Sequence, residues 1–398
     1  VDKEGDFKDK PVEIPPSVVN SVLDMGEYPS LRPLRAVVVN PALLPSGRIV
    51  DQSGYDAESG LFYRPDAQIT IPSSPSKADA EAAAKRLLDY VKHTQWTDER
   101  GPSVWLSLVL TIAGRAAIPT APSFGFDAAV QKSGKTSLVK IAYGLMHGHT
   151  IITQPPPPEK EEEVEKRLPQ WATMSVVCFD NLAKMFASAN LDQAITAART
   201  GTRKLGVNAG ITCDFTSTTF CYTGNNLTVG DDAASRTLIA RIRTPLTRKF
   251  EFAVDDAEFY RSQRPGAVSD ALTILRAFIV AGSPQTDGPD CRFVEWSRLI
   301  RGAVKWLGMA DPVGGEVVDA GAEVDQEPGG QLAVFGELAH VGLLQPRGDV
   351  PVDVAHVVVV LVFAQVGEIQ PRAAHQRAVV ALQQAVETAD HRPLEAVQ

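Results

Sequence analysis

The chain has 398 residues and a net charge of −9 at neutral pH, with 44% hydrophobic and 22% charged residues. This composition is typical of a globular chain of about two or three domains, and it excludes collagen, wholesale disorder and a small disulfide-rich scaffold. Residues 306–398 hold 4 Arg, no Lys and 13 acidic residues, so residues 1–305 are neutral, with 35 residues of each sign. The acidity therefore counts against a nucleic-acid partner only in the C-terminal part, because affinity for phosphates comes mainly from Lys and Arg.

Cysteine and histidine spacing gives no sign of a zinc site. The four cysteines form no CxxC pair, and the seven histidines show no HxxxH or HExxH spacing. We therefore expect reduced, mostly buried thiols in a cytoplasmic protein. The longest apolar run, residues 355–364, is about half as long as a bilayer span, so we expect no membrane partner.

Composition and periodicity divide the chain into five predicted parts. Residues 1–75 read as a β-rich segment of short strands and turns, with a Pro-Ser-Gly turn at 45–47. Residues 76–115 form a helical segment, with helices expected from residue 77 and over 103–115. The remaining parts are an α/β core over 116–250, a helical part over 251–313 and a Val/Ala-rich tail over 314–398.

The α/β core alternates apolar runs with helical patterns. We expect strands at 123–130, 149–153, 174–179 and 216–222, and helices at 135–146 and 159–167. Such alternation predicts a mostly parallel sheet flanked by helices. Beyond the core, helices are expected over 268–282 and 293–307. Two interpretations of the tail stay open: a native C-terminal domain, or a segment translated from another reading frame.

A phosphate-binding loop is predicted between the first strand and helix of this core. The run Gln131-Lys132-Ser133-Gly134-Lys135-Thr136 ends in the GK[ST] pattern, although Ala129 stands where the full GxxxxGK[ST] pattern has its first glycine. Backbone N–H groups of such a loop and the N-terminus of the following helix can cradle phosphates. Lys135 would reach the β- and γ-phosphates, and the Thr136 hydroxyl would bind Mg²⁺. The alternative is an ordinary surface turn.

Two further candidates follow, each about 45 residues after the last. The apolar strand 174–179 ends in Asp180, which is where a Walker B aspartate would orient Mg²⁺. Asn181 follows it in place of the acidic residue that usually polarises water. The strand 216–222 then leads into Asn225 and Asn226; we favour Asn225 as an amide that senses the γ-phosphate, with a plain Asn-rich turn as the alternative.

Basic residues suggest two more sites. Residues 199–210 carry three basic residues and three glycines, which suggests a hairpin that presents Arg203 and Lys204 to the phosphates of single-stranded DNA, or else an exposed basic loop. Arg236 follows the sensor strand and is our candidate for an arginine finger that acts on a neighbouring subunit.

The ordered series AVQKSGKT, VVCFDN, RKLG, TGNN and DDAASR resembles the P-loop ATPase module of phage and integrated-element primase-helicases, a group similar to superfamily 3 and AAA+ ring helicases. The resemblance covers about residues 30–313. It implies a hexameric ring that hydrolyses ATP with Mg²⁺ to move on single-stranded or forked DNA, often beside a primase domain or protein. It also implies a bacterial or phage-infected host cell. It further implies that Asp180 followed by Asn181 is a pair that this group of proteins itself uses.

The sequence therefore predicts an NTP-dependent DNA helicase or translocase of a phage or mobile-element replication system. Lys135, Asp180, Asn225 and Arg236 are its expected catalytic residues. Two alternatives stay open: an ATP-binding, DNA-associated switch or scaffold with little hydrolysis, and a P-loop enzyme that transfers phosphoryl groups to a small molecule.

Overall fold

The computed structural model describes most of residues 31–313 and little outside them. The described residues are 15, 17–18, 21, 31–129, 133–182, 188–203, 210–227, 235–243, 250, 252–285, 287–288, 290–313 and 342–344. The chain divides into two compact units, one made of Val1–Ala36, Gly60–Phe62 and Leu338–Gln398, the other of Val37–Ser59 and Tyr63–Glu337. In the first unit, β1 (Leu31–Pro33) pairs antiparallel with β13 (Gly342–Leu344). All remaining features below belong to the second unit, apart from parts of two short strands.

Short strands occupy the N-terminal region, as its sequence predicts. They are β2 (Ala36–Val38), β3 (Ala42–Leu43), β4 (Ile49–Val50), β5 (Gly54–Asp56) and β6 (Leu61–Tyr63). The strands β3 and β4 form an antiparallel hairpin around the predicted turn, where Gly47 has a φ of +81°. Such a left-handed backbone favours glycine, because it brings the Cβ of other residues too close to the backbone.

Two helices precede the central sheet. Helix α2 (Lys77–Asp89) begins with a capping box, in which Ser76 and Asp79 each accept a hydrogen bond from the other's backbone N–H. Helix α3 (Arg100–Ala113) is apolar and almost entirely buried, and the 3₁₀ turn η1 (Arg115–Ala117) follows it. Both predicted helices are therefore confirmed.

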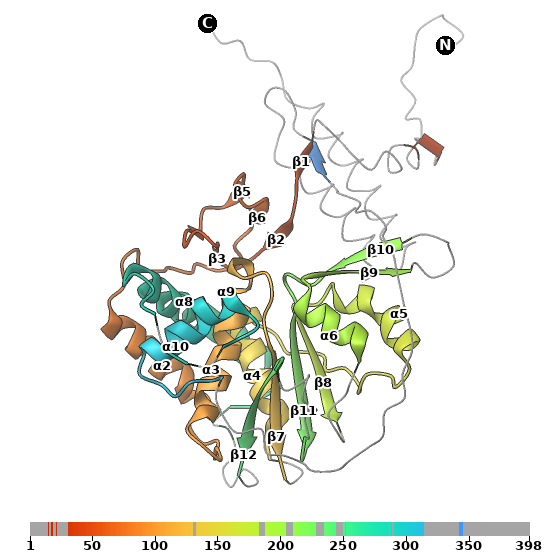
Figure 1. Cartoon of the computed structure of the whole chain (residues 1–398). Coiled ribbons are helices and arrows are strands. Elements are labelled where there is room, and N and C mark those ends of the chain that lie inside the picture. The colour runs from red at the N-terminus through yellow and green to blue at the C-terminus, as the bar shows by residue number, and fades with distance from the viewer. Residues whose placement is uncertain are drawn as a thin grey trace, which may run out of the picture. The chain divides into compact units, whose positions relative to one another are not determined.

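The central sheet has four parallel strands in the order β12-β7-β11-β8 (Figure 1). Their bounds are β7 (Ser123–Ala128), β8 (Val176–Leu182), β11 (Thr219–Asn225) and β12 (Thr237–Ile242). All of β7 is buried, and so is the apolar run Val176–Phe179 of β8, as expected for a sheet that is covered by helices. In Figure 1 helices α2, α3, α4 and α8–α10 lie to the left of the sheet, and α5 and α6 lie to its right. The predicted α/β class is confirmed.

Helices fill the crossovers between these strands. They are α4 (Lys135–His147), α5 (Glu161–Trp171) and α6 (Ala189–Thr196). The ends of α4 and α5 lie within a few residues of the bounds that the sequence predicts. An antiparallel hairpin of β9 (Arg199–Arg203) and β10 (Gly210–Asp214) follows α6, as the glycine and basic pattern suggests.

The strand predicted at 149–153 is wrong. The structure has no ladder there, and only Gln154 bridges to β8: its N–H donates to the Cys178 carbonyl at 2.7 Å and its carbonyl accepts from Asp180 N–H at 2.9 Å. Ile152 is 79% exposed. Four prolines at 155–158 follow, and their lack of N–H groups prevents a longer ladder.

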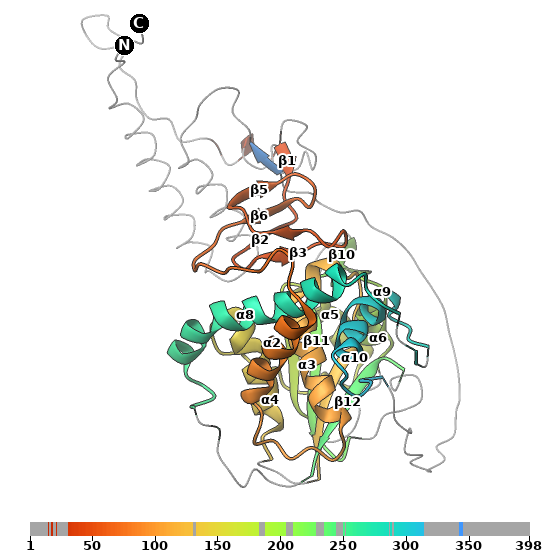
Figure 2. The same ribbon diagram turned by 90° about the vertical axis from the view of Figure 1, so that its left-hand side faces the viewer.

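The helices after β12 pack against the helices that precede and follow β7. Helix α8 (Ala257–Val280) crosses α2, α3 and α4 (Figure 2) and begins well before the predicted Val268. The segment predicted at 293–307 consists of α9 (Val294–Trp296), the π-helix η2 (Ser297–Arg301) and α10 (Gly302–Trp306).

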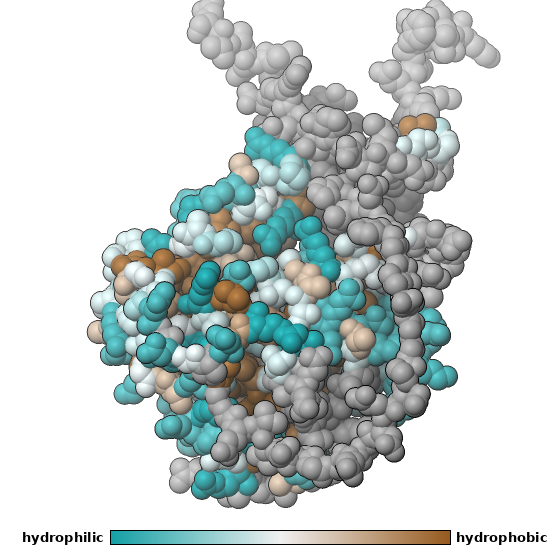
Figure 3. Space-filling model, viewed as in Figure 1, coloured by the Kyte–Doolittle hydropathy of each residue, from teal (hydrophilic) through white to brown (hydrophobic). Residues whose placement is uncertain are grey.

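The surface and the thiols agree with a globular chain. Cys178, Cys213 and Cys221 are buried, Cys291 is half-buried, and all four are free thiols, as predicted. Hydrophobic and hydrophilic residues are interspersed on the described part of the face in Figure 3. Within the described ranges no helix is long and apolar enough to cross a bilayer.

Candidate functional site

The predicted phosphate loop lies between the end of β7 and the start of α4. Gly134 caps α4 with a φ of +88°, and the helix begins at Lys135. The first N–H groups of a helix have no partner within it, so they are available to an anion at this end. Ser133 is almost fully buried, whereas Gln131 and Lys132 lie outside the described residues.

The Lys135 ammonium group points back across the end of the sheet. Its Nζ donates to Ser133 Oγ at 3.0 Å and to Asn225 Oδ1, at the end of β11, at 2.7 Å. Burial lowers the pKa of Lys135 from its usual 10.5, and the carboxylates of Asp127 and Asp180 oppose that shift. The loop lysine is thus directly joined to the predicted sensor amide.

A second set of contacts joins α4 to β8 and β11. The Thr136 hydroxyl donates to Asp180 Oδ1 at 2.6 Å, and the Thr223 hydroxyl donates to the same oxygen. Thr223 Oγ1 in turn accepts from the N–H of Asn181, whose φ is +60°. Hydroxyl and carboxylate oxygens are the ligands that Mg²⁺ prefers, so Thr136 and Asp180 form a donor set that fits this ion.

The turn after β11 is closely packed. Asn226 has a φ of +52°, and the Leu227 N–H donates to Asp127 Oδ1 at 3.0 Å. A Cβ at Gly224 would lie 2.6 Å from the Leu182 carbonyl oxygen and 2.3 Å from Leu227 Cδ2. Only glycine therefore fits between β11, β8 and this turn without a shift of the surroundings.

The structure brings together part of the predicted set. Ser133, Gly134, Lys135, Thr136, Asp180 and Asn225 share the carboxyl end of the sheet, because parallel strands end at one edge. Arg236 precedes β12 at the opposite, amino end, where its side chain is 11% exposed and lies 3.7 Å from Asp192. A role for Arg236 in a neighbouring subunit stays a prediction.

The basic hairpin forms a two-stranded sheet of its own, separate from the sheet that carries this cluster. Arg203 ends β9 opposite Gly210, and Lys204 lies outside the described residues. Their contact with DNA stays a prediction.

Two residues of the cluster were missed from the sequence. Thr223 lies two residues before Asn225, so the two-residue period of a strand places both side chains on one face. That spacing could have identified Thr223. Asp127 had no such signal, because its partners Leu227 and Arg241 are about 100 residues away.

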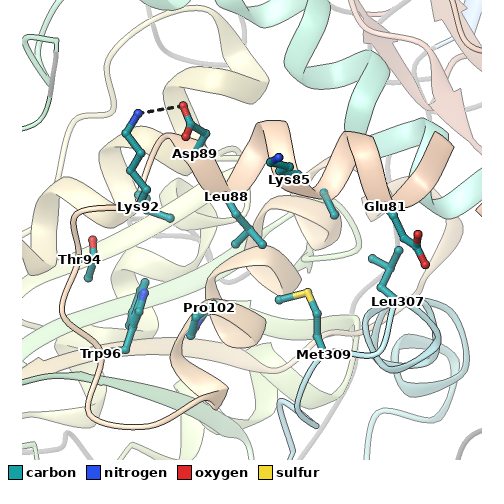
Figure 4. Close-up of a pocket in the computed structure, with 12 residues that line it drawn as sticks. Glu81, Lys85, Leu88, Asp89, Lys92, Thr94, Trp96, Pro102, Leu307 and Met309 are labelled. Atoms are coloured by element: carbon teal, nitrogen blue, oxygen red, sulfur yellow. Dashed lines mark hydrogen bonds and ion pairs between the residues drawn. The ribbon is translucent and has the colours of Figure 1, made fainter. Parts of the chain in front are cut away.

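A hollow of about 530 Å³ lies elsewhere in this unit, beside α2 (Figure 4). Its charged lining comprises two acids and two lysines, Glu81, Asp89, Lys85 and Lys92, and Asp89 and Lys92 pair at 3.2 Å. Trp96, Leu307 and Met309 supply much of the apolar lining. Balanced charge gives this hollow no preference for a phosphate group, and Ser133 to Thr136, the part of the loop that the structure describes, does not line it.

The fold and this edge define an α/β protein with a P-loop NTPase-like core. No protein-family model matches the chain, and no curated protein matches it. Among solved structures, it is similar to the A form apo structure of the NrS-1 C-terminal region, with 13% identity and a TM-score of 0.33 over 53% of this chain and 50% of that one. The chain thus spans about half the length of that structure.

Two other similar structures are helicases by name. A JCV helicase with a bound small molecule shares 14% identity at a TM-score of 0.26, over 59% of this chain and 69% of that one. The active helicase SCCmec type IV Cch shares 12% identity at a TM-score of 0.32, over 73% and 59%. Similarity at this level does not bear on function.

Proposed function

We propose that this chain is an NTP-dependent DNA helicase or translocase of a phage or mobile-element replication system, active as a homo-oligomeric, hexameric ring. The observation that carries the proposal is the convergence of Lys135, Thr136, Asp180 and Asn225 at the carboxyl end of three adjacent parallel strands. An amine, a hydroxyl, a carboxylate and an amide are the groups that phosphoryl transfer from a nucleotide requires.

Each group has a distinct role in this proposal. The loop from Gln131 to Gly134 and the N-terminus of α4 bind the phosphates of ATP, and the Lys135 ammonium group neutralises their charge. Thr136 and Asp180 hold Mg²⁺, which supplies charge neutralisation at the phosphates when bound. Asn225 orients its amide toward the terminal phosphate. The Lys135–Asn225 hydrogen bond supports this pairing of roles.

The remaining roles concern partners. Arg203 and Lys204 contact the backbone of single-stranded or forked DNA, and Arg236 acts on an adjacent subunit. A primase domain or protein would complete the replication machinery. The resemblance of the motif series carries these assignments, with the hairpin β9–β10 as their structural support.

The test is steady-state NTP hydrolysis with and without single-stranded DNA, for the wild type and Lys135→Ala. Loss of a buried cation at the reacting charge should lower kcat/KM about 100-fold or more. Lys140→Ala is the matched control, because Lys140 lies on the same helix but pairs with Asp255 at 2.7 Å. Full DNA-stimulated activity in Lys135→Ala would refute the proposal.

One observation favours a second candidate, a nucleotide-dependent switch with little hydrolysis. Asn181 follows Asp180, and its backbone N–H is bound to Thr223. An amide there cannot act as a base toward water, whereas a carboxylate could. The same assay separates the two functions: a switch binds ATP but shows slow hydrolysis that single-stranded DNA does not stimulate.

A further inference from the structure

Asp127 is a buried carboxylate near the phosphate loop that the roles above do not use. It lies near the end of β7 and is 4% exposed. Its Oδ1 accepts from Leu227 N–H at 3.0 Å, and its Oδ2 accepts from Arg241 Nε at 3.3 Å. A buried charge costs free energy unless it is paired and hydrogen-bonded, so both partners are needed to keep Asp127 in place.

The register of the sheet puts this carboxylate between two strands. Asp127 lies opposite Gly224 of β11 on one side and opposite Arg241 of β12 on the other. It therefore links the ends of three neighbouring strands, which lie side by side in Figure 1.

The contact with Leu227 fixes the turn that carries Asn225. The Leu227 side chain is 2% exposed and lies over Gly224, and Asn226 holds the left-handed backbone between them. Asn225, the last residue of β11, directly precedes this turn and accepts from Lys135 Nζ at 2.7 Å, so a shift of the turn would move its amide. Without an acceptor at Asp127, the Leu227 N–H would be left buried and unpaired.

We propose that Asp127, with Arg241 as its counter-ion, is a positioning residue of the nucleotide site, which holds the turn 225–227 so that the Asn225 amide faces Lys135 and the terminal phosphate. This inference rests on the proposed nucleotide chemistry. Asp127 acts through Asn225 and is not itself a catalytic residue. The side chain of Arg241 is 42% exposed, so it neutralises Asp127 from the rim of the site.

Three variants and one control test the proposal. Asp127→Ala removes the acceptor of the Leu227 N–H, and Asp127→Ser leaves only a hydroxyl oxygen one bond closer to the backbone than the carboxylate oxygens. Asp127→Asn keeps an oxygen at the original position. Asp311→Ala is the control, because Asp311 also accepts from a backbone N–H, of Val313, and from an arginine Nε, of Arg301. Asp311→Ala therefore measures how the loss of a similar pair of hydrogen bonds, away from the phosphate loop, changes stability and kcat.

We expect Asp127→Ala and Asp127→Ser to lower kcat for ATP about 10- to 100-fold, the size expected for a misplaced group, while affinity for a fluorescent ATP analogue changes less than about threefold. In the nucleotide-free protein, hydrogen exchange should speed up in the peptide that contains Leu227. Asp127→Asn should retain slow exchange and most of kcat. Asp311→Ala should lower the melting temperature with kcat unchanged.

Unchanged Leu227 exchange or unchanged kcat in Asp127→Ala would overturn the proposal. So would equal losses of kcat in Asp127→Ala and Asp311→Ala, or failure of all three Asp127 variants to fold, since either result would assign Asp127 a purely structural role. A wild type without ATP hydrolysis would instead refute the proposed function, while the exchange experiment would still decide whether Asp127 holds the turn.

Discussion

A methyl group added at Gly224 tests how tightly the site is enclosed. In Gly224→Ala the new Cβ would lie 2.6 Å from the Leu182 carbonyl oxygen and 2.3 Å from Leu227 Cδ2. The leucine side chain can rotate, but the carbonyl belongs to the backbone of β8. Ordinary contact needs about 3.5 Å, so β11 and β8 would have to separate by roughly 0.5–1 Å.

Two effects of known size follow from that separation. Overpacking of this kind costs about 1–3 kcal/mol in the free energy of unfolding, which lowers the melting temperature by about 3–10 °C in a domain of this size. The same movement separates Thr223 and Asn225 from Asp180 and Lys135. A misplacement of about 1 Å at a reacting centre can lower the rate about 100-fold, so kcat should fall much more than stability alone explains.

The assay is thermal unfolding followed by circular dichroism, together with kcat for ATP well below the melting temperature. Gly266→Ala is the matched control, because Gly266 lies inside α8 and a Cβ there meets nothing within 4 Å. Alanine is a better helix former than glycine by about 0.5–1 kcal/mol, so this control should raise the melting temperature and leave kcat unchanged. A Gly224→Ala protein with wild-type stability and kcat would refute the packing described for this edge.

Two further predictions concern Thr223 and His147. Thr223→Val removes the donor to Asp180 and the acceptor of the Asn181 N–H, so it should cost about 1–3 kcal/mol of stability and lower kcat about 10-fold, with Thr223→Ser close to wild type in both assays. Burial lowers the pKa of His147 from 6.5 to about 3, so the unfolded chain binds a proton below pH 6.5 that the folded chain does not. Stability should then fall as pH drops from 6.5 toward 3, by about 2 kcal/mol at pH 5, and chemical denaturation of His147→Gln should show a smaller fall; an equal fall would contradict the assignment.

Local sequence signals predicted the elements whose chemistry lies within a few neighbouring residues. The strand, loop and helix around Lys135 could be predicted because glycine, lysine and threonine follow one another in a run, and Asp180 because it directly follows an apolar run. The start of α8 was missed because Pro265-Gly266 reads as a breaker. Its buried face, together with the cap at Asp256, evidently outweighs the one hydrogen bond that proline removes.

Long-range register decides the rest of the site, and one sequence does not reveal it. The strand order places β11 between β7 and β8, which brings Asn225 to Lys135 across 90 residues of chain. The partnership of Asp127 with Leu227 depends on the same order. The strand expected at 149–153 was predicted from its local β-branched run alone. It is absent from the structure, and the prolines that follow the run cannot extend a ladder.

Hydrogen bonds and ion pairs at this edge join all four strands of the sheet. Arg241 of β12 pairs with Asp127 of β7, and Asp127 accepts from Leu227 N–H in the turn after β11. Asn225, at the end of β11, accepts from Lys135. From β8, Asp180 binds Thr223 of β11 and Thr136 of α4. Arg241 in β12 and Arg236 just before it therefore differ in the residues that they contact. Arg241 is joined to Lys135 and Asn225 within its own chain through these contacts, whereas Arg236, at the amino end of β12, lies 3.7 Å from Asp192 and its role in a neighbouring subunit stays a prediction.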